Sequence, residues 1–91
     1  MTRDSNIDIV WRRITELEGE EFQQIRGARF TYTITGNALV PNRTNRQLPR
    51  SQFGKALDFM PVENTVPLQH LQGPSYLYAI LMDPRVRRGD W

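Results

Sequence analysis

The sequence predicts a small α+β domain, in which a three-stranded antiparallel sheet is combined with about three helices in the chain order α-β-β-β-α-α. Two patterns favour this fold class: apolar residues recur at helical spacing near both ends of the chain, and they alternate with polar residues in between. The length of 91 residues suits one hydrophobic core, since a domain usually takes roughly 100 to 200 residues. We therefore expect a single domain over residues 1–91, with flexible ends at 1–5 and 86–91.

The first element that the pattern predicts is an amphipathic helix. Asp4 or Ser5 is a candidate cap at its start, and Gly19 marks its end. The apolar residues between them follow at spacings of three and four residues: Ile7, Val10, Trp11, Ile14 and Leu17. Because such a stripe packs against a core far more often than it binds a ligand, we interpret this helix as structural.

Three strands are expected next, because the period changes to two. They cover residues 22–25, 30–35 and 38–40, with glycine-containing turns between them. In the second strand Tyr32 shares its side with apolar residues, which predicts that its ring belongs to the core. We expect the helices to cover one face of this meander and the face that carries the threonines to be exposed.

Two further helices are expected after a polar loop. Ser51 or a neighbouring group would cap the second helix, which ends at Pro61. The residues on its buried side are Phe53, Ala56, Leu57 and Met60. The third helix opens at Pro74 and runs through Met82, where Asp83-Pro84 ends it.

Charge is strongly segregated along the chain. The first 21 residues are acidic overall, whereas the stretch from Phe22 to Leu57 contains no Asp or Glu. The basic residues of this stretch are Arg26, Arg29, Arg43, Arg46, Arg50 and Lys55. Such segregation produces a local positive field that the net charge of +2 conceals, and this field is typical of a phosphate-binding surface. Double-stranded DNA is therefore the partner that we expect.

The leading candidate site is the polar loop over residues 42–47, together with the start of the helix that follows it. Its candidate DNA-binding residues are Arg43, Asn45, Arg46, Arg50, Ser51 and Lys55. Arg grips a phosphate or a guanine edge with its planar fork, Asn pairs with adenine, and the amides at a helix N-terminus attract anions. The alternative is a solvated, Arg-rich loop that binds no partner.

The exposed face of the sheet is the second candidate site. By alternation, Arg29, Thr31 and Thr33 lie on one side and would extend the surface of the loop. The alternative is an ordinary polar face, because threonine is common in strands.

The sequence does not point to catalysis, and we expect neither catalytic residues nor a metal or cofactor. His70 is the one histidine and lies in a loop rich in Pro and Gln, without any recognised active-site motif. The lack of cysteine excludes disulfides and thiol nucleophiles and fits an intracellular protein. Because no apolar segment is long enough for a signal peptide or a membrane span, we expect a cytoplasmic protein without a membrane partner.

Four segments together resemble a known family: Phe30 to Tyr32, Arg43 to Arg46, Ser51 to Leu57 and Gly73 to Leu81. They are similar to small bacterial stand-alone DNA-binding domains that read 5-methylcytosine, and to the N-terminal readers of some modification-dependent restriction endonucleases. The resemblance covers residues from about 7 to 86. It implies a protein that reads modified DNA and lacks a nuclease domain.

Recognition of 5-methylcytosine requires an apolar or π surface near a hydrogen-bond acceptor, because the methyl group lies in the major groove beside the N4 donor. Burial of the methyl group contributes only ~0.8 kcal/mol, so a positioned ring or guanidinium has to contact it as well. The candidates for this modified-base contact are Tyr32, Arg43 and Arg46.

We therefore predict a non-catalytic protein that binds duplex DNA and, as the resemblance implies, selects methylated cytosine. The alternative is a protein-protein interaction module, antitoxin-like or an oligomeric partner, that uses the aromatic-rich third helix and the acidic first helix. Salt would weaken binding to DNA, whereas an apolar protein interface would survive it. The recognised base sequence, the groove and the oligomeric state are left open by the sequence.

Overall fold

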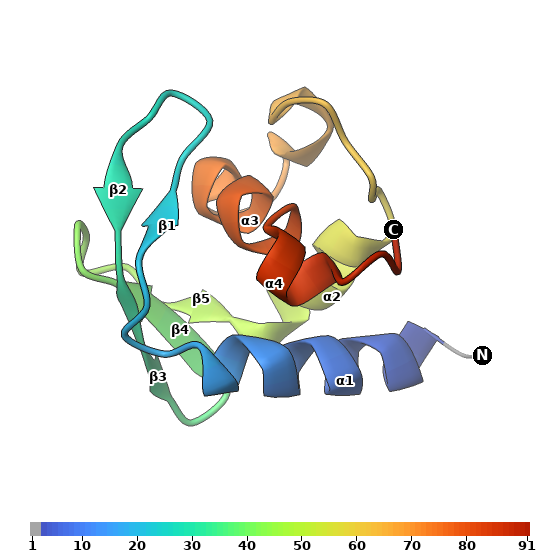
Figure 1. Ribbon diagram of the computed structural model, residues 1–91, viewed down its shortest axis with the longest axis horizontal. Helices are drawn as coiled ribbons and strands as arrows, with labels where there is room; N and C mark the ends of the chain where they lie inside the picture. The colour runs from blue at the N-terminus through green and yellow to red at the C-terminus, as the bar shows by residue number, and fades with distance from the viewer. Residues whose placement is uncertain (1–2) are drawn as a thin grey trace.

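The computed structural model describes residues 3–91, including the side chains from Ile7 onward, and has an α+β fold (Figure 1). Its helices are α1 (Arg3–Glu16), α2 (Arg50–Leu57), α3 (Pro74–Leu81) and the short α4 (Pro84–Arg87), with a 3₁₀ turn, η1 (Val66–Leu68), before α3. Its strands are β1 (Phe22–Gln23), β2 (Arg29–Phe30), β3 (Tyr32–Thr35), β4 (Ala38–Pro41) and β5 (Leu48–Pro49). The predicted fold class is confirmed. The predicted single sheet and three helices are wrong, because the described residues form two antiparallel sheets and four α-helices.

The two sheets meet at Thr31, where the predicted strand over 30–35 is interrupted. β1 pairs with β2 on one side of this residue, and β3 pairs with β4 on the other. Thr31 itself bonds to Asn42: its N–H donates to the Asn42 Oδ1 at 3.0 Å, and its carbonyl accepts from the Asn42 N–H at 2.9 Å. The chain thus passes from a two-stranded ribbon into a separate sheet with the strand order β3-β4-β5.

The strand β5 is the one that the sequence pattern does not predict. It consists of Leu48 and Pro49, which are too few residues to show an alternation. Proline is tolerated there because β5 forms an edge of its sheet. As a result, the polar loop over 42–47 connects two strands instead of leading directly into a helix.

One hydrophobic core lies between the helices and the two sheets. The helices contribute the buried residues Val10, Trp11 and Ile14 of α1, Phe53 and Ala56 of α2, and Leu77, Ala79, Ile80 and Leu81 of α3. From the strands, Phe22 and Phe30 stack with ring centroids 6.0 Å apart, and the Tyr32 ring lies 5.4 Å from Phe22. Burial of these aromatic residues confirms the predicted inward side, and their strand neighbours Gln23, Arg29 and Thr33 are exposed on the other side.

The predicted starts of the first two helices are wrong. α1 begins before Asp4 and Ser5, which therefore lie inside it rather than at its cap. α2 begins before Ser51, and the carbonyl of Asn37 accepts the N–H of Arg50 at 2.7 Å. The start of α2 is thus fixed by the turn between β3 and β4, a contact that is distant in sequence.

The predicted bounds of α3 are nearly correct, whereas α2 ends earlier than predicted. α3 begins at Pro74 as expected and ends one residue before Met82. α2 stops at Leu57, short of Pro61, because the next three N–H groups donate to carbonyls three residues back, which tightens the last turn. Met60 consequently lies beyond the helix and, like Leu57, is only partly buried.

The end of the chain is packed where the sequence predicts a flexible segment over 86–91. The Asp83 side chain caps α4, and Val86 within this helix is fully buried. The indole N–H of Trp91 donates to the carbonyl of Leu81 at 2.7 Å. A helix of four residues is too short to show an apolar period, so the sequence pattern does not reveal that Val86, which lies among arginines, belongs to the core.

The N-terminal segment over 1–5, also predicted to be flexible, is described only in part. Residues 1–2 lie outside the described residues, and the backbone of residues 3–5 belongs to α1. Within the described part of the chain, no helix combines the length and the apolar character that crossing a bilayer requires.

Alanine at Gly54 tests the packing of α2 on α1. A Cβ atom there would lie 3.6 Å from the Ile7 side chain, which is ordinary van der Waals contact. Alanine is favoured over glycine in a helix interior by about 1 kcal/mol, so we expect Gly54→Ala to raise the unfolding free energy by up to that amount. Urea denaturation measures this change.

Alanine at Gly73 is the matched control and has the opposite expected sign. Gly73 has a φ of 59°, and an added Cβ would lie 3.0 Å from the Leu48 side chain. We expect Gly73→Ala to lower the unfolding free energy by roughly 1 kcal/mol or more, because both the backbone conformation and the contact become strained. A destabilising Gly54→Ala or a stabilising Gly73→Ala would contradict this packing.

Candidate nucleic-acid interface

The loop over residues 42–47 is a hydrogen-bonded turn with outward-pointing polar side chains. The Thr44 N–H donates to the Pro41 carbonyl at 3.3 Å, and the Arg46 N–H donates to the Thr44 Oγ1 at 3.2 Å. Arg43, Asn45 and Arg46 are exposed. Among the side chains that the structure describes, neither arginine forms an ion pair. The loop therefore presents two guanidinium groups whose charge is not neutralised by a neighbouring carboxylate.

Arg29 lies at the same end of the molecule as this loop. It is two residues from Thr31, which is bonded to Asn42 at the start of the loop, and Figure 1 shows the loop beside β2. The Arg29 guanidinium lies 3.3 Å from a Glu21 carboxylate oxygen, and the two side chains are 68% and 59% exposed. An ion pair this exposed contributes at most about 1 kcal/mol, so a phosphate can compete with Glu21 for Arg29.

The threonine face of β3 is exposed as predicted but is less positive than the loop. Thr33 is exposed and Thr31 is half-buried. β3 forms an edge of its sheet, where the Ile34 N–H donates to a carboxylate oxygen of Glu18 at 2.6 Å. Glu18 thus places a negative charge beside Thr33, which makes this end of the face a poorer surface for phosphate.

The three remaining candidates lie at the opposite end of the three-stranded sheet. Arg50 begins α2 beside the turn between β3 and β4, and its guanidinium is paired with Asp8 of α1. The four residues of β3 separate this turn from Thr31 by roughly 13 Å or more, at about 3.3 Å per residue. Ser51 and Lys55 are exposed on α2. The two residues of β5 thus separate the loop from the start of α2, and the expectation that both contribute to one site stays a prediction.

The start of α2 lines an open groove of about 610 Å³. Its lining residues are Ile7, Asn37, Pro49, Arg50, Ser51, Gly54, Lys55 and Asp58. Lys55 has no ion pair among the described side chains, but the Asp58 carboxylate shares the groove. Gly54, which lacks a side chain, faces Ile7 of α1. The groove is accordingly of mixed charge and less suited to a polyanion than the loop.

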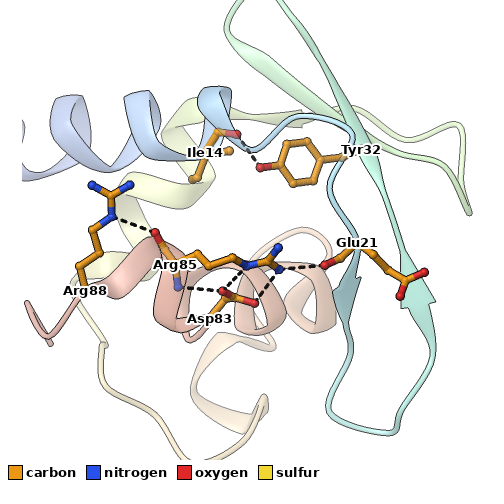
Figure 2. A network of polar contacts seen from close by, with 6 residues as sticks. All are labelled: Ile14, Glu21, Tyr32, Asp83, Arg85 and Arg88. Atoms are coloured by element: carbon orange, nitrogen blue, oxygen red, sulfur yellow. Dashed lines mark hydrogen bonds and ion pairs between the residues drawn. The ribbon is translucent and has the colours of Figure 1, made fainter.

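Tyr32 is not available for contact with a modified base. Its side chain is 1% exposed, and its hydroxyl donates to the carbonyl of Ile14 at the end of α1 (Figure 2). Burial raises the pKa of the Tyr32 hydroxyl well above its ordinary value, and the nearby Arg85 opposes this effect only in part. The predicted base contact of Tyr32 is wrong because its ring shares the inward side of the strand with Phe30.

Arg85 is held by several contacts, although no sequence pattern singles it out. Its guanidinium bonds both carboxylate oxygens of Asp83, donates to the Glu21 carbonyl at 2.8 Å and lies 4.3 Å from the centroid of the Phe22 ring (Figure 2). Burial alone would raise the pKa of Asp83, but the hydrogen bonds from Arg85 outweigh it and lower that pKa, while Asp83 raises the pKa of Arg85. Arg85 thus connects α4 with Phe22 of β1, and the Asp83 carboxylate neutralises its charge.

The described residues offer little for a metal centre. No group of three or more His, Cys, Asp or Glu side chains gathers among them in a way that could hold a metal ion. His70 is exposed and packs edge-on against the Phe59 ring, with centroids 5.1 Å apart. Its surroundings are therefore those of a surface histidine beside an aromatic ring.

Comparison of the chain with family profiles, with curated proteins and with solved structures gives no match. The resemblance to 5-methylcytosine readers consequently stays a prediction, as does the absence of catalysis. The function has to be inferred from the geometry of the exposed cations.

The substitution Tyr32→Phe separates a structural role from a binding role. Loss of the hydrogen bond to Ile14 should lower the unfolding free energy by about 1 kcal/mol at pH 7, with no change in affinity for DNA. Because the pKa of Tyr32 is raised in the folded state, the wild-type contribution is complete below the ordinary value of 10.0 and declines as the pH rises above it. The difference in stability between the two proteins should therefore narrow above pH 10, as measured by urea denaturation. A weaker affinity for DNA in a folded Tyr32→Phe protein would place the Tyr32 hydroxyl in the binding site and contradict this assignment.

Proposed function

We propose that this protein binds duplex DNA without catalysis, and that the loop over residues 42–47 is its principal contact with the phosphate backbone. The observation that supports this proposal is the pair of exposed guanidinium groups on the loop, Arg43 and Arg46, which have no carboxylate partner among the described side chains. They stand in a stretch of chain without any acidic residue. A planar guanidinium binds phosphate oxygens in a bidentate manner, which fixes orientation as well as charge.

The neighbours of the two arginines complete the proposed surface. Arg29 adds a third guanidinium at the same end of the molecule, where its exposed contact with Glu21 is weak enough to be exchanged for a contact with the duplex. Asn45 lies between the two loop arginines and has the amide that pairs with an adenine edge. Lys55 and Ser51 on α2 would serve as a flanking contact, whereas Arg50 remains engaged with Asp8.

Selection of 5-methylcytosine is the finer part of the proposal and rests on the resemblance. With Tyr32 in the core, the groups left to contact the methyl group are the guanidinium planes of Arg43 and Arg46. Burial of one methyl group contributes ~0.8 kcal/mol, about a fourfold preference, unless a guanidinium stacks on the modified base as well. The proposed preference for methylated DNA is accordingly modest.

A protein-protein interaction module is less well supported. The aromatic-rich third helix, which that alternative requires, lies largely in the core: Leu77, Ala79, Ile80 and Leu81 of α3 are buried. α1 presents Ile9, 41% exposed, as its one large apolar group among those described as exposed. An isolated apolar residue of this kind is ordinary on a soluble surface.

The substitution Arg46→Ala tests the phosphate contact. We expect roughly five- to tenfold weaker binding to a mixed-sequence duplex at low salt, together with a slope of log affinity against log salt that is smaller by about one. Fluorescence anisotropy at several salt concentrations measures both quantities.

The matched control is Arg12→Ala, which removes the same charge from the exposed side of α1. It should leave the slope unchanged. Equal effects of the two substitutions on affinity and on the salt slope would indicate a nonspecific dependence on net charge. Salt-independent binding of the wild-type protein to another protein would favour the interaction module. Methylated, unmethylated and single-stranded oligonucleotides in the same assay test the modest preference for methylated duplex.

A further inference from the structure

The β1–β2 ribbon, residues 22–30, projects from the core next to the loop over residues 42–47. Figure 1 shows it extending away from α1, with its turn at the far end. Its base is anchored in the core, because Phe22 and Phe30 are each 2% exposed and Phe30 packs edge-on against the Tyr76 ring at 4.9 Å. The side-chain amide of Gln24 also donates to the Ser75 hydroxyl at 3.1 Å. These contacts from α3 hold the ribbon in place before any ligand binds.

The outward face of the ribbon carries two side chains that are suited to base edges. Gln23 and Arg29 are directly opposite each other in the register of β1 and β2, and both are exposed. They alternate with the buried phenylalanines, so their direction is fixed by the core. At the turn, Arg26 is exposed without an ion pair among the described side chains, and Ile25 is 45% exposed.

The chemistry of this pair matches the major groove. That groove admits a two-stranded ribbon, and within it Gln pairs with the N6 and N7 of adenine while Arg pairs with the O6 and N7 of guanine. The Gln23 amide donates one hydrogen to the Gly27 carbonyl at 3.2 Å, which leaves its second hydrogen and its oxygen for a bidentate contact. Glu21, immediately before the ribbon, contacts Arg29 across an exposed pair that a base edge would replace.

We propose that the β1–β2 ribbon enters the major groove of the bound duplex and that Gln23 and Arg29 read base edges there. This inference rests on the proposed function. The hydrogen bonds between Thr31 and Asn42 join the ribbon to the loop, so the loop arginines grip a phosphate backbone that borders the same groove. Gln23 is then a determinant of sequence preference rather than of overall affinity, because phosphate contacts carry most of the affinity and base contacts carry the specificity.

The test compares Gln23→Ala with the wild-type protein and with Gln72→Ala, the same change at an exposed residue before α3. The wild-type chain first selects its preferred sequence from a randomised duplex pool. Anisotropy then gives the ratio of affinities for the preferred duplex and a scrambled one. We expect Gln23→Ala to lower this ratio about fivefold or more, with affinity for the scrambled duplex unchanged within about twofold, and Gln72→Ala to have no effect.

A second arm identifies the groove. Replacement of adenine by 7-deazaadenine at the affected position removes a major-groove acceptor and should lower the preference of the wild-type protein but not that of Gln23→Ala. Three outcomes would contradict base reading by the ribbon and leave the proposed function unaffected. The affinity ratio stays unchanged in Gln23→Ala, the affinity for both duplexes falls equally, or the wild-type protein binds duplexes without any sequence preference. Failure of the wild-type protein to bind any duplex at low salt would overturn the proposed function itself.

Discussion

The burial of aromatic residues along the first three strands determines which side of the β1–β2 ribbon faces solvent. Phe22, Phe30 and Tyr32 occupy one side of the chain and pack against α1, α3 and each other. Since successive residues of a strand point to opposite sides, the residues next to Phe22 and Phe30 on their strands, Gln23 and Arg29, face solvent. The core therefore fixes the direction of Gln23 and Arg29, and no separate interaction is required to display them.

Internal pairing reduces the positive surface to a smaller area than the sequence implies. Arg50 is paired with Asp8 of α1, and Arg29 touches Glu21, although each of these bases lies in the stretch of chain without acidic residues. The charge distribution along the sequence does not reveal these ion pairs, because it does not show which acidic segment packs against which cation. Arg43 and Arg46 escape this pairing among the described side chains, and this is why the proposed contact with DNA centres on the loop.

Elements with a long apolar period were predictable, whereas those defined by a few residues were not. α1, α3 and the inward side of the strands follow from spacing alone. β5 and α4 have two and four residues, and both depend on tertiary contacts that leave no periodic signal. The break at Thr31 has the same origin: its N–H and carbonyl are bonded to Asn42, eleven residues away, and this contact divides one predicted strand into parts of two sheets.

The exposure of the loop side chains could be predicted from the sequence, but the other residues that share their surface could not. Exposure of Arg43, Asn45 and Arg46 follows from a polar run between apolar strands, while the placement of Arg50 depends on a bond between its N–H and the carbonyl of Asn37. The outward pairing of Gln23 with Arg29 also needs the register of β1 and β2, which a two-residue strand does not encode locally. Distances along the chain were thus a poor guide to which polar groups share a surface.

An NMR titration of the ¹⁵N-labelled protein with a short DNA duplex at low salt tests the proposed DNA interface. Binding through the loop and the ribbon should change the backbone amide shifts of residues 23–31 and 42–47, at one end of the molecule, and leave those of α1 and α4 constant. Shifts confined to α1 and α4, or no shifts at all with saturating duplex, would rule out this interface.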